Sequence, residues 1–469
     1  MNTVQRILKN FLSLTFANLF TSLLGVVTVT YLARILGPQD FGKINFALAV
    51  VNYFAIFSHF GLNTIGTREI ARNKEKINDY VGNILTLKLC LGTIAYLLLL
   101  IFVFFINKPL DIKYLIILYG FTIFTTSVLL LDWVFQGIEE MKYVGISLVL
   151  QAIFYLGTIL SVIRSSEHLL YIPGILVFSQ LLQVLFLFFI FTKNFRLIKM
   201  KFDLNLWKFF LKESIPISLT GIPVMVIYNT GIVVLGILKS AQETGYFSGA
   251  YKLILLFGTV VAIYSTAIFP AISFYYKNSK EVLSKFLNYS IKLVLIFCLP
   301  ITVGCMILAK PIITLIYGSK YLFAAIIFQF LILNVIPRGM DIIFSQTLWA
   351  TDQQKEVLRI SCIQAVWVLI NSLILTKLFG VIGTSIAFIT GEFIAFPMYY
   401  YKIKKITDVS IHKYLLKPLI ASVSMGLFLL FCPKLDIFSS ILLGATIYFL
   451  VLFTIKGINF REIQLVFQR

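Results

Sequence analysis

Charged side chains are scarce in this sequence. Of its 469 residues only 13% are charged, whereas 59% are hydrophobic. A soluble domain carries about 25% charged residues, and the polar exterior that a soluble protein needs could not be built from this composition. The mean hydropathy of +0.94 therefore excludes an ordinary soluble protein and predicts a chain that has lipid as its solvent.

Residues that bind metals or perform catalysis are also few. The chain has 3 His and 5 Cys, and their positions show neither a metal-binding spacing nor a disulfide framework. The P-loop motif G-x-x-x-x-G-K-[ST] is missing, which excludes that kind of ATP site. No D-x-D pair and no Ser-His-Asp arrangement is present. We therefore expect a protein that is not an enzyme and that uses neither a metal nor a cofactor.

Long apolar runs fill the rest of the chain. A membrane-spanning helix needs about 20 mostly apolar residues, and the first run is too long to be a cleaved signal peptide. We predict fourteen spans, near residues 11–33, 44–66, 83–106, 114–136, 143–163, 169–192, 214–238, 246–272, 286–308, 322–349, 357–376, 380–401, 418–433 and 437–455.

The basic residues indicate how these spans are oriented. The net charge of +20 could suggest a nucleic-acid partner, but Lys and Arg lie mainly in short segments between apolar runs. With the N-terminus inside, the cytoplasmic segments carry 26 of the 40 Lys and Arg residues and the outside segments carry 10. This positive-inside bias predicts a multi-pass protein of the cell membrane with both termini in the cytoplasm, and no nucleic-acid partner.

The spacing of the spans suggests two repeats. Basic stretches follow the sixth and the twelfth predicted span, near residues 193–212 and 402–417. Six spans are an even number, so both repeats enter the membrane in the same sense, as in transporters built from parallel repeats. We predict an all-α integral membrane protein with a six-helix lobe at 1–200, a second six-helix lobe at 201–405, and two extra helices with a cytoplasmic tail at 406–469.

A few basic residues lie within or beside the spans, where an ionisable group is costly and normally faces a partner or a water-filled cavity. They could line such a cavity and bind an anionic group of a substrate. Alternatively, the lysines could extend along the helix to the membrane surface, and the arginine at the end of the first span could cap helix carbonyls. The candidates are Lys88, Lys252, Lys292 and Arg34.

Arg338 and Asp341 form a further candidate in the tenth span. They are three residues apart, and hence on one face of a helix, just after Pro337, which should kink that helix. They could be a neutral structural pair. Alternatively, a substrate phosphate could compete with Asp341 for Arg338, because a guanidinium binds phosphate through two parallel hydrogen bonds.

Asp341 and three other ionisable groups could couple transport to an ion gradient. Asp132 and Glu392 are acids within or near spans, and burial favours the protonated form of a carboxyl group. His59 lies one helical turn before Asn63, so polar packing explains it equally well. Asp132 also precedes Trp133, as an anchor at the membrane surface would.

Several sequence motifs carry a family resemblance. They are YLARILGPQDFG (31–42), GLNTIGTREIA (61–71), DWVFQGIEEMKY (132–143), TGIVVLG (230–236) with GYF (245–247), and GTSIAFITGE (383–392). The pattern W-x-F-Q-G-x-E-x-M-K-Y is the most specific of them. With these motifs the first 400 residues resemble the Wzx-type O-antigen and oligosaccharide flippases, which share a superfamily with the multidrug and toxic-compound extruders and the lipid II flippases.

The resemblance implies two six-helix lobes around a central cavity that presents cations to a diphosphate. The implied substrate is a polyprenyl-diphosphate-linked oligosaccharide that moves from the cytoplasmic to the outer leaflet, ahead of its assembly into O-antigen or capsule. The implied partners are this lipid-linked glycan, membrane lipid and the polysaccharide polymerase machinery. In this chain the fitting cations are Lys88, Lys252, Lys292, Arg338 and Arg34.

Two alternatives compete with this function. A multidrug exporter of the same superfamily usually needs an acidic cavity for cationic drugs, but these spans hold more cations than acids. A membrane glycan polymerase or ligase needs a sizeable outside loop for its catalytic groups, and the sequence has none. We therefore favour a flippase that works by ion-coupled or facilitated alternating access.

Overall fold

Helices make up nearly all of the structure, a computed structural model that describes residues 3–195, 199–432 and 436–457. Side chains are described from Ser13 onward, and no strand occurs among these residues. The helical class predicted from the sequence is confirmed. Most of the cytoplasmic tail predicted after the last span lies outside the described residues.

Two helices are too long for one crossing of a membrane. They are α1 (Thr3–His59) and α14 (Gln354–Ile406). A helix of 53 residues measures about 80 Å, whereas the hydrocarbon layer is about 30 Å thick. Each contains a glycine with positive φ, Gly37 at 69° and Gly380 at 61°, a conformation that side chains disfavour.

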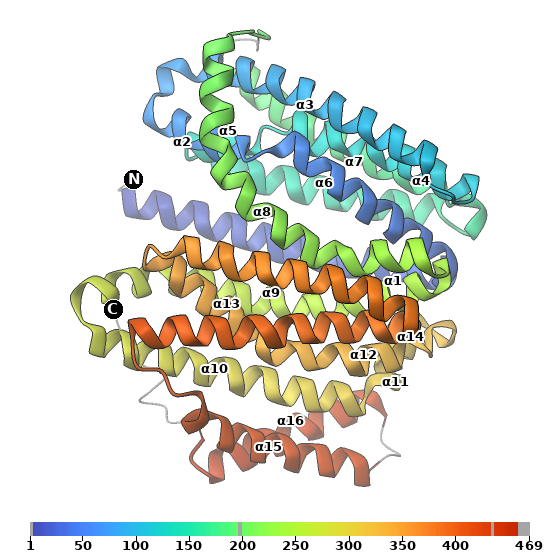
Figure 1. Ribbon diagram of the computed structural model, residues 1–469, viewed down its shortest axis with the longest axis vertical. Helices are drawn as coiled ribbons and strands as arrows, with labels where there is room; N and C mark the ends of the chain where they lie inside the picture. Colours follow the sequence, from blue (N-terminus) through green and yellow to red (C-terminus); the bar gives the residue numbers. More distant parts are fainter. Residues whose placement is uncertain (1–2, 196–198, 433–435, 458–469) are drawn as a thin grey trace. The chain divides into compact units, whose positions relative to one another are not determined.

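The orange-coloured α14 folds back on itself at its glycine (Figure 1). The Thr376 and Thr384 hydroxyls, on either side of Gly380, lie 2.7 Å apart. Farther from the bend, the Ser361 and Tyr399 hydroxyls are hydrogen-bonded at 3.3 Å, so the two lengths stay side by side.

Twelve helices within the described ranges are long and apolar enough to cross a membrane, counting α1 and α14 once each. The sequence-predicted spans fall on these helices. The count of fourteen crossings stays a prediction.

The chain divides into two compact units, Met1–Gly236 and Ile237–Arg469. The finer division at residues 200 and 405 also stays a prediction. The first unit contains α1, α2 (Leu62–Arg72), α3 (Ile77–Phe105), α4 (Leu110–Gly120), α5 (Asp132–Gly137), α6 (Met141–Val162), α7 (Tyr171–Asn194) and most of α8 (Leu204–Leu238).

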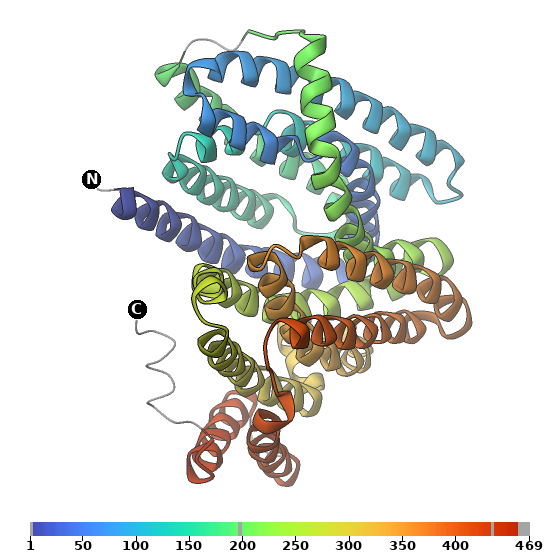
Figure 2. The ribbon, with the colours of Figure 1, turned by 60° about the vertical axis from the view of Figure 1, so that its left-hand side comes forward.

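In the first unit α1 packs against α3, α4 and α6, and α6 packs against α7. Figure 2 shows α6 and α7 as neighbouring helices in the blue-green part of this unit. The predicted span at 114–136 is interrupted. After α4 the chain forms a π-helical turn (Ile123–Val128) and then α5. Such turns are rare and often occur at functional sites. This one places Asp132 at the start of a short helix.

The second unit consists of the end of α8 and the remaining helices. They are α9 (Ala241–Asn278), α10 (Lys280–Ile307), α11 (Ala309–Tyr317), α12 (Ala324–Leu331), α13 (Val335–Ala350), α14, α15 (Ile411–Phe431) and α16 (Ile437–Thr454). In this unit α13 packs against α9, α14 and α10, while α15 packs against α10 and α16.

Side chains at three helix starts supply hydrogen bonds that the backbone lacks there. Ser240 and Ser279 cap α9 and α10. Asp436 caps α16 by accepting from the Phe438 and Ser439 amides at 3.0 and 3.1 Å. The Ser439 hydroxyl and these amides hold the pKa of the Asp436 carboxyl below its ordinary value. These caps explain why the helices begin where they do.

Large apolar side chains cover much of the outer surface. Phe104 and Phe105 near the end of α3 are each 78% exposed, and Phe431 at the end of α15 is 82% exposed. Polar side chains such as Ser147, Ser290 and Thr347 are fully buried instead. Apolar surface on long helices fits a lipid environment, and the chain is a multi-pass membrane protein.

Candidate functional site

Five side chains from four helices form a polar cluster in the first unit, which we call the lysine cluster. Its members are His59 (α1), Asn63 (α2), Lys88 (α3), and Asp132 and Trp133 (α5). The Lys88 ammonium donates a short hydrogen bond to Asn63 Oδ1 and lies 5.2 Å from the centre of the Trp133 ring. His59 and Asp132 are within electrostatic reach of Lys88.

Lys88 is completely buried. It lies about three helical turns, or about 16 Å, after the start of α3 at Ile77, and its complete burial favours the interpretation in which it faces protein partners. No carboxylate of the described residues forms a salt bridge with it. Its charge is stabilised by an amide oxygen and an aromatic face, with the Asp132 carboxyl within electrostatic reach.

A break between α1 and α2 lies beside the lysine cluster. The two residues after His59 have positive φ, Phe60 at 37° and Gly61 at 68°. A Cβ at Gly61 would lie 2.9 Å from the Ser214 carbonyl of α8, so only glycine fits this contact. The break separates His59 from Asn63, which the sequence predicted on one continuous helix, yet both reach the cluster.

Close packing of α2 on α5 fixes the Trp133 ring. A Cβ at Gly66 would lie 2.4 Å from two carbons of that ring. We expect Gly66→Ala to lower the free energy of unfolding by about 1–3 kcal/mol, the usual cost of overpacking. The melting temperature of the purified protein measures this effect. Gly157→Ala in α6 is the control, because a Cβ there meets nothing within 4 Å, and an equal loss in both variants would contradict the assignment.

A second polar cluster lies in the other unit, and we call it the arginine cluster. It contains Arg338 and Asp341 of α13 with Glu392 and Tyr399 of α14. Arg338 Nη1 donates to Glu392 Oε1 at 3.3 Å, and Asp341 is only 3% exposed. The Tyr399 ring is within electrostatic reach of all three charged groups. The sequence placed Arg338 and Asp341 on one helical face, and the salt bridge from Arg338 to Glu392 is a contact that it did not predict.

Two carboxyl groups meet beside Arg338. Those of Asp341 and Glu392 are within hydrogen-bond reach of each other. Neither oxygen of Asp341 receives a hydrogen bond from a donor in the described part of the chain. Two carboxylates at such a distance in a low dielectric cannot both remain charged at low cost. This cluster therefore combines one cation with two closely spaced acids.

Three other predicted cations are not placed in either cluster by a described contact. Lys252 in α9 and Lys292 in α10 are partly exposed, and Arg34 near the bend of α1 is exposed. The nine candidate residues therefore separate into three groups. His59, Lys88 and Asp132 meet in one unit, and Arg338, Asp341 and Glu392 meet in the other.

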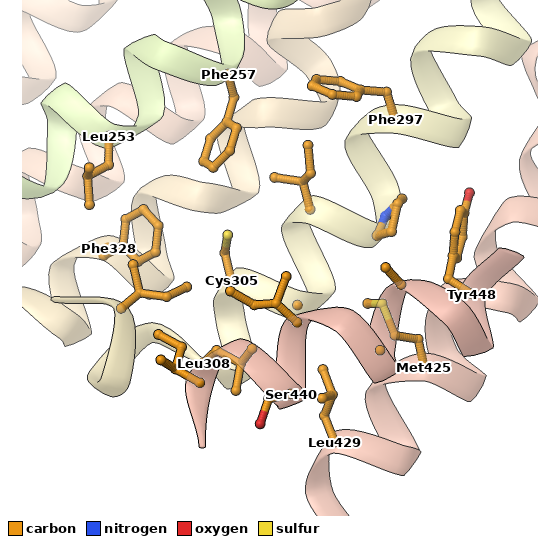
Figure 3. A pocket seen from close by; sticks show the side chains of 18 of the residues that line it. Leu253, Phe257, Phe297, Cys305, Leu308, Phe328, Met425, Leu429, Ser440 and Tyr448 are labelled. Atoms are coloured by element: carbon orange, nitrogen blue, oxygen red, sulfur yellow. The ribbon is translucent and has the colours of Figure 1, made fainter. Parts of the chain in front are cut away.

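An apolar groove of about 630 Å³ lies in the second unit between the last two helices and α9–α12 (Figure 3). Phe257, Phe297 and Cys305 line one side, and Met425 and Leu429 line the other. Two hydroxyl-bearing side chains, Ser440 and Tyr448, also contribute to the lining. The Tyr448 hydroxyl donates to the Ile296 carbonyl at 2.8 Å. Because this hydroxyl already has a partner, the groove wall is suited to a hydrocarbon ligand.

Comparison with known proteins finds a matching family model and several relatives. A family model described as polysaccharide biosynthesis protein matches residues 7–276. The capsular polysaccharide biosynthesis protein CapF of Staphylococcus aureus is 23% identical over 85% of this chain and 99% of its own length. A putative O-antigen transporter of Shigella flexneri is 25% identical over 81% of this chain and 94% of its own length.

Solved structures identify the fold. The lipid II flippase MurJ in an inward closed conformation superposes with a TM-score of 0.79. The match covers 93% of this chain and 97% of MurJ at 17% sequence identity, so the likeness concerns the fold. Since the family model spans more than half of its residues, the chain belongs to the polysaccharide biosynthesis protein family.

Proposed function

We propose that the protein is a flippase for a polyprenyl-diphosphate-linked oligosaccharide. It carries this lipid from the cytoplasmic to the outer leaflet, ahead of assembly into a surface polysaccharide. Membership of the polysaccharide biosynthesis family supports this function. Relatives named as an O-antigen transporter and a capsular polysaccharide protein, which align over more than 80% of this chain, support it further.

The observation that carries the proposal is the buried charge of Lys88. An ammonium at this depth is costly, and here it lacks a salt bridge within the described residues. Asp132 lies within electrostatic reach of Lys88, and a diphosphate would add an anion that accepts a hydrogen bond from the ammonium directly, since ammonium–phosphate hydrogen bonds are strong. Lys88 is covered by Asn63 and Trp133. We expect movement of α2 about the break at Phe60 and Gly61 to open the site.

The groove between α15, α16 and α9–α12, within the second unit, suits a polyprenyl chain. A polyprenyl chain is hydrocarbon, and burying it in an apolar groove is favourable by roughly 25 cal/mol per Å² of apolar surface. The two helices beyond the twelfth predicted span form one wall of this groove. The chain thus offers a charged site for the diphosphate and an apolar site for the lipid.

The arginine cluster is the proposed place of ion coupling. Arg338, Asp341 and Glu392 lie near the middle of the helical segments that carry them. A proton shared between the two acids leaves one negative charge for Arg338. Gain or loss of that proton therefore changes the net charge of the cluster. Within the first unit we assign Arg34, Asp132 and His59 to substrate contact beside Lys88, and within the second unit Lys252 and Lys292 stay candidate cations for an anionic group.

The alternatives are less well supported. A site for cationic drugs needs a surplus of acid, yet Asp132 lies near Lys88 and Glu392 binds Arg338. A glycan polymerase or ligase needs a catalytic domain outside the membrane, and the described connections between helices are short. We therefore propose transport without catalysis. The charge bias supports a cytoplasmic position for both termini, and the polysaccharide polymerase is the expected partner on the product side.

Depletion of the protein tests this function in cells. We expect the lipid-linked oligosaccharide to accumulate on the cytoplasmic leaflet and the surface polysaccharide to disappear. A membrane-impermeant glycosidase or lectin distinguishes the two leaflets in intact cells and inverted vesicles. Expression of the wild-type chain from a plasmid is the control. Normal delivery of the glycan to the outer leaflet in a clean deletion strain would contradict the proposal.

A further inference from the structure

Another polar surface lies on the first unit, about two helical turns before His59 along α1. It consists of two residue pairs that join α1 to α8. Asn52 Nδ2 donates to Asn229 Oδ1 at 3.2 Å, and the Tyr53 and Thr230 hydroxyls are hydrogen-bonded at 2.8 Å. We call these four residues the amide pair surface.

Packing on both sides fixes the position of these pairs. The Phe46 ring fills the space beside Gly236, where a Cβ would lie 1.9 Å from the ring. Towards the other end, Arg68 of α2 binds Glu213 at 2.8 Å. Residues with higher numbers in α1 and α2 contact residues with lower numbers in α8, so α8 runs antiparallel to α1 and α2. The amides meet because of this antiparallel packing.

Asn52 is exposed although it lies deep in an apolar helix. It is fourteen residues after Pro38, or about 21 Å along α1. Asn229 is nine residues before the end of α8, or about 14 Å. An exposed amide at such depth is costly against hydrocarbon and is normally found facing a water-filled cavity. The amide pair surface therefore lies on a hydrated wall of the first unit.

The exposed amide also retains hydrogen-bonding capacity. Asn229 uses its own Nδ2 to donate to the Met225 carbonyl at 3.0 Å, and Asn52 gives one hydrogen to Asn229. The Oδ1 atom of Asn52 and its second amide hydrogen have no partner in the described part of the chain. An adjacent donor and acceptor match a sugar hydroxyl, which both donates and accepts.

The amide pair surface lies along the same helix as the lysine cluster. Asn52 and His59 are seven residues apart, which places them on one face of α1 about 10 Å from each other. A sugar linked to a diphosphate lies within that distance of its phosphates. We infer that the amide pair surface contacts the first sugars of the lipid-linked glycan while the lysine cluster binds the diphosphate. This inference rests on the proposed function and adds a glycan-recognition site to it.

Binding of two probes tests the inference. The probes are the polyprenyl-diphosphate-linked glycan extracted from the source membranes and undecaprenyl diphosphate, which lacks sugar. We expect Asn52→Leu in nanodiscs to weaken glycolipid binding about fivefold to tenfold, the value of one hydrogen bond, and to leave undecaprenyl diphosphate binding unchanged. Asn371→Leu is the matched control, because that exposed amide donates back to the Trp367 carbonyl of its own helix.

The outcomes separate the two proposals. If the wild type binds neither probe, the proposed function fails and this inference fails with it. If both probes bind and Asn52→Leu leaves glycolipid binding unchanged, or weakens both probes equally, the inference alone is overturned. A selective loss for the glycolipid supports it.

Cysteine labelling tests the hydrated wall without a substrate. In a variant without native cysteines, a cysteine substituted for Asn52 should react with a charged thiosulfonate reagent in nanodiscs, and the glycolipid should slow this reaction. Leu97→Cys is the control, since Leu97 is 52% exposed within an apolar run of α3 and should stay unreactive. Failure of the Asn52 position to react would overturn the inference.

Discussion

Replacement of Arg338 by glutamine is expected to lower the free energy of unfolding by about 3–5 kcal/mol, because it leaves buried acids without their cation. Glu392 binds Arg338 at 3.3 Å and its side chain is only 10% exposed. Asp341 beside it is 3% exposed. Thermal unfolding of the purified protein measures the loss. Lys285→Gln, which breaks a pair whose side chains are 65% and 78% exposed, should cause no measurable change.

A second substitution separates stability from transport. Adding Glu392→Gln to Arg338→Gln removes one of the two acids, so we expect most of the lost stability to return. Glycan delivery should stay low, because the double variant can no longer exchange a proton against a fixed cation. If the single variant Arg338→Gln is as stable as the wild type, Arg338 does not neutralise the buried acids Asp341 and Glu392. Recovery of delivery in the double variant would remove the cluster from the mechanism.

Replacement of Lys88 by methionine is expected to reduce glycan delivery at least tenfold. Methionine has a similar volume and no charge, so the fit beneath Trp133 remains while the ammonium for the diphosphate is lost. Removal of one charge from a buried, hydrogen-bonded site typically costs 2–5 kcal/mol of binding. Delivery is measured as lipid-linked glycan in the outer leaflet, normalised to the amount of protein in the membrane.

Two companion variants complete the Lys88 experiment. Lys88→Met with Asp132→Asn removes both charges, so the variant should fold normally and still fail in delivery. Lys142→Met is the control, because Lys142 is 47% exposed and binds Glu140 at 2.9 Å. Wild-type delivery by Lys88→Met would show that this lysine does not bind the substrate.

The apolar runs predicted the long helices because the requirement for about 20 apolar residues acts locally. The breaks within them depend on tertiary contacts. Nothing in the residues near Ile123 indicated a π-helical turn, and the sequence did not predict α11 at all. The bend lies at Gly380, the first residue of the predicted span at 380–401, and there a glycine offered a visible signal.

The candidate sites were predicted less completely. Spacing along one helix identified Arg338 and Asp341, but Glu392 lies 54 residues away on another helix, and such a pairing is invisible to a local pattern. A surface anchor was one alternative for the Asp132–Trp133 pair, and the contact of the Trp133 ring with Lys88 was not predicted. Asn52 and Asn229 are 177 residues apart. An amide within an apolar run was the available signal for each.

Flipping by the purified protein tests the central claim most directly. The protein is reconstituted into liposomes that contain the extracted polyprenyl-diphosphate-linked glycan, and an impermeant glycosidase reports how much glycan reaches the outer leaflet. We predict that the glycan in the inner leaflet becomes accessible within minutes with the wild type and stays protected with Lys88→Met. Protection of that glycan in wild-type liposomes, equal to that in protein-free liposomes, would contradict the account.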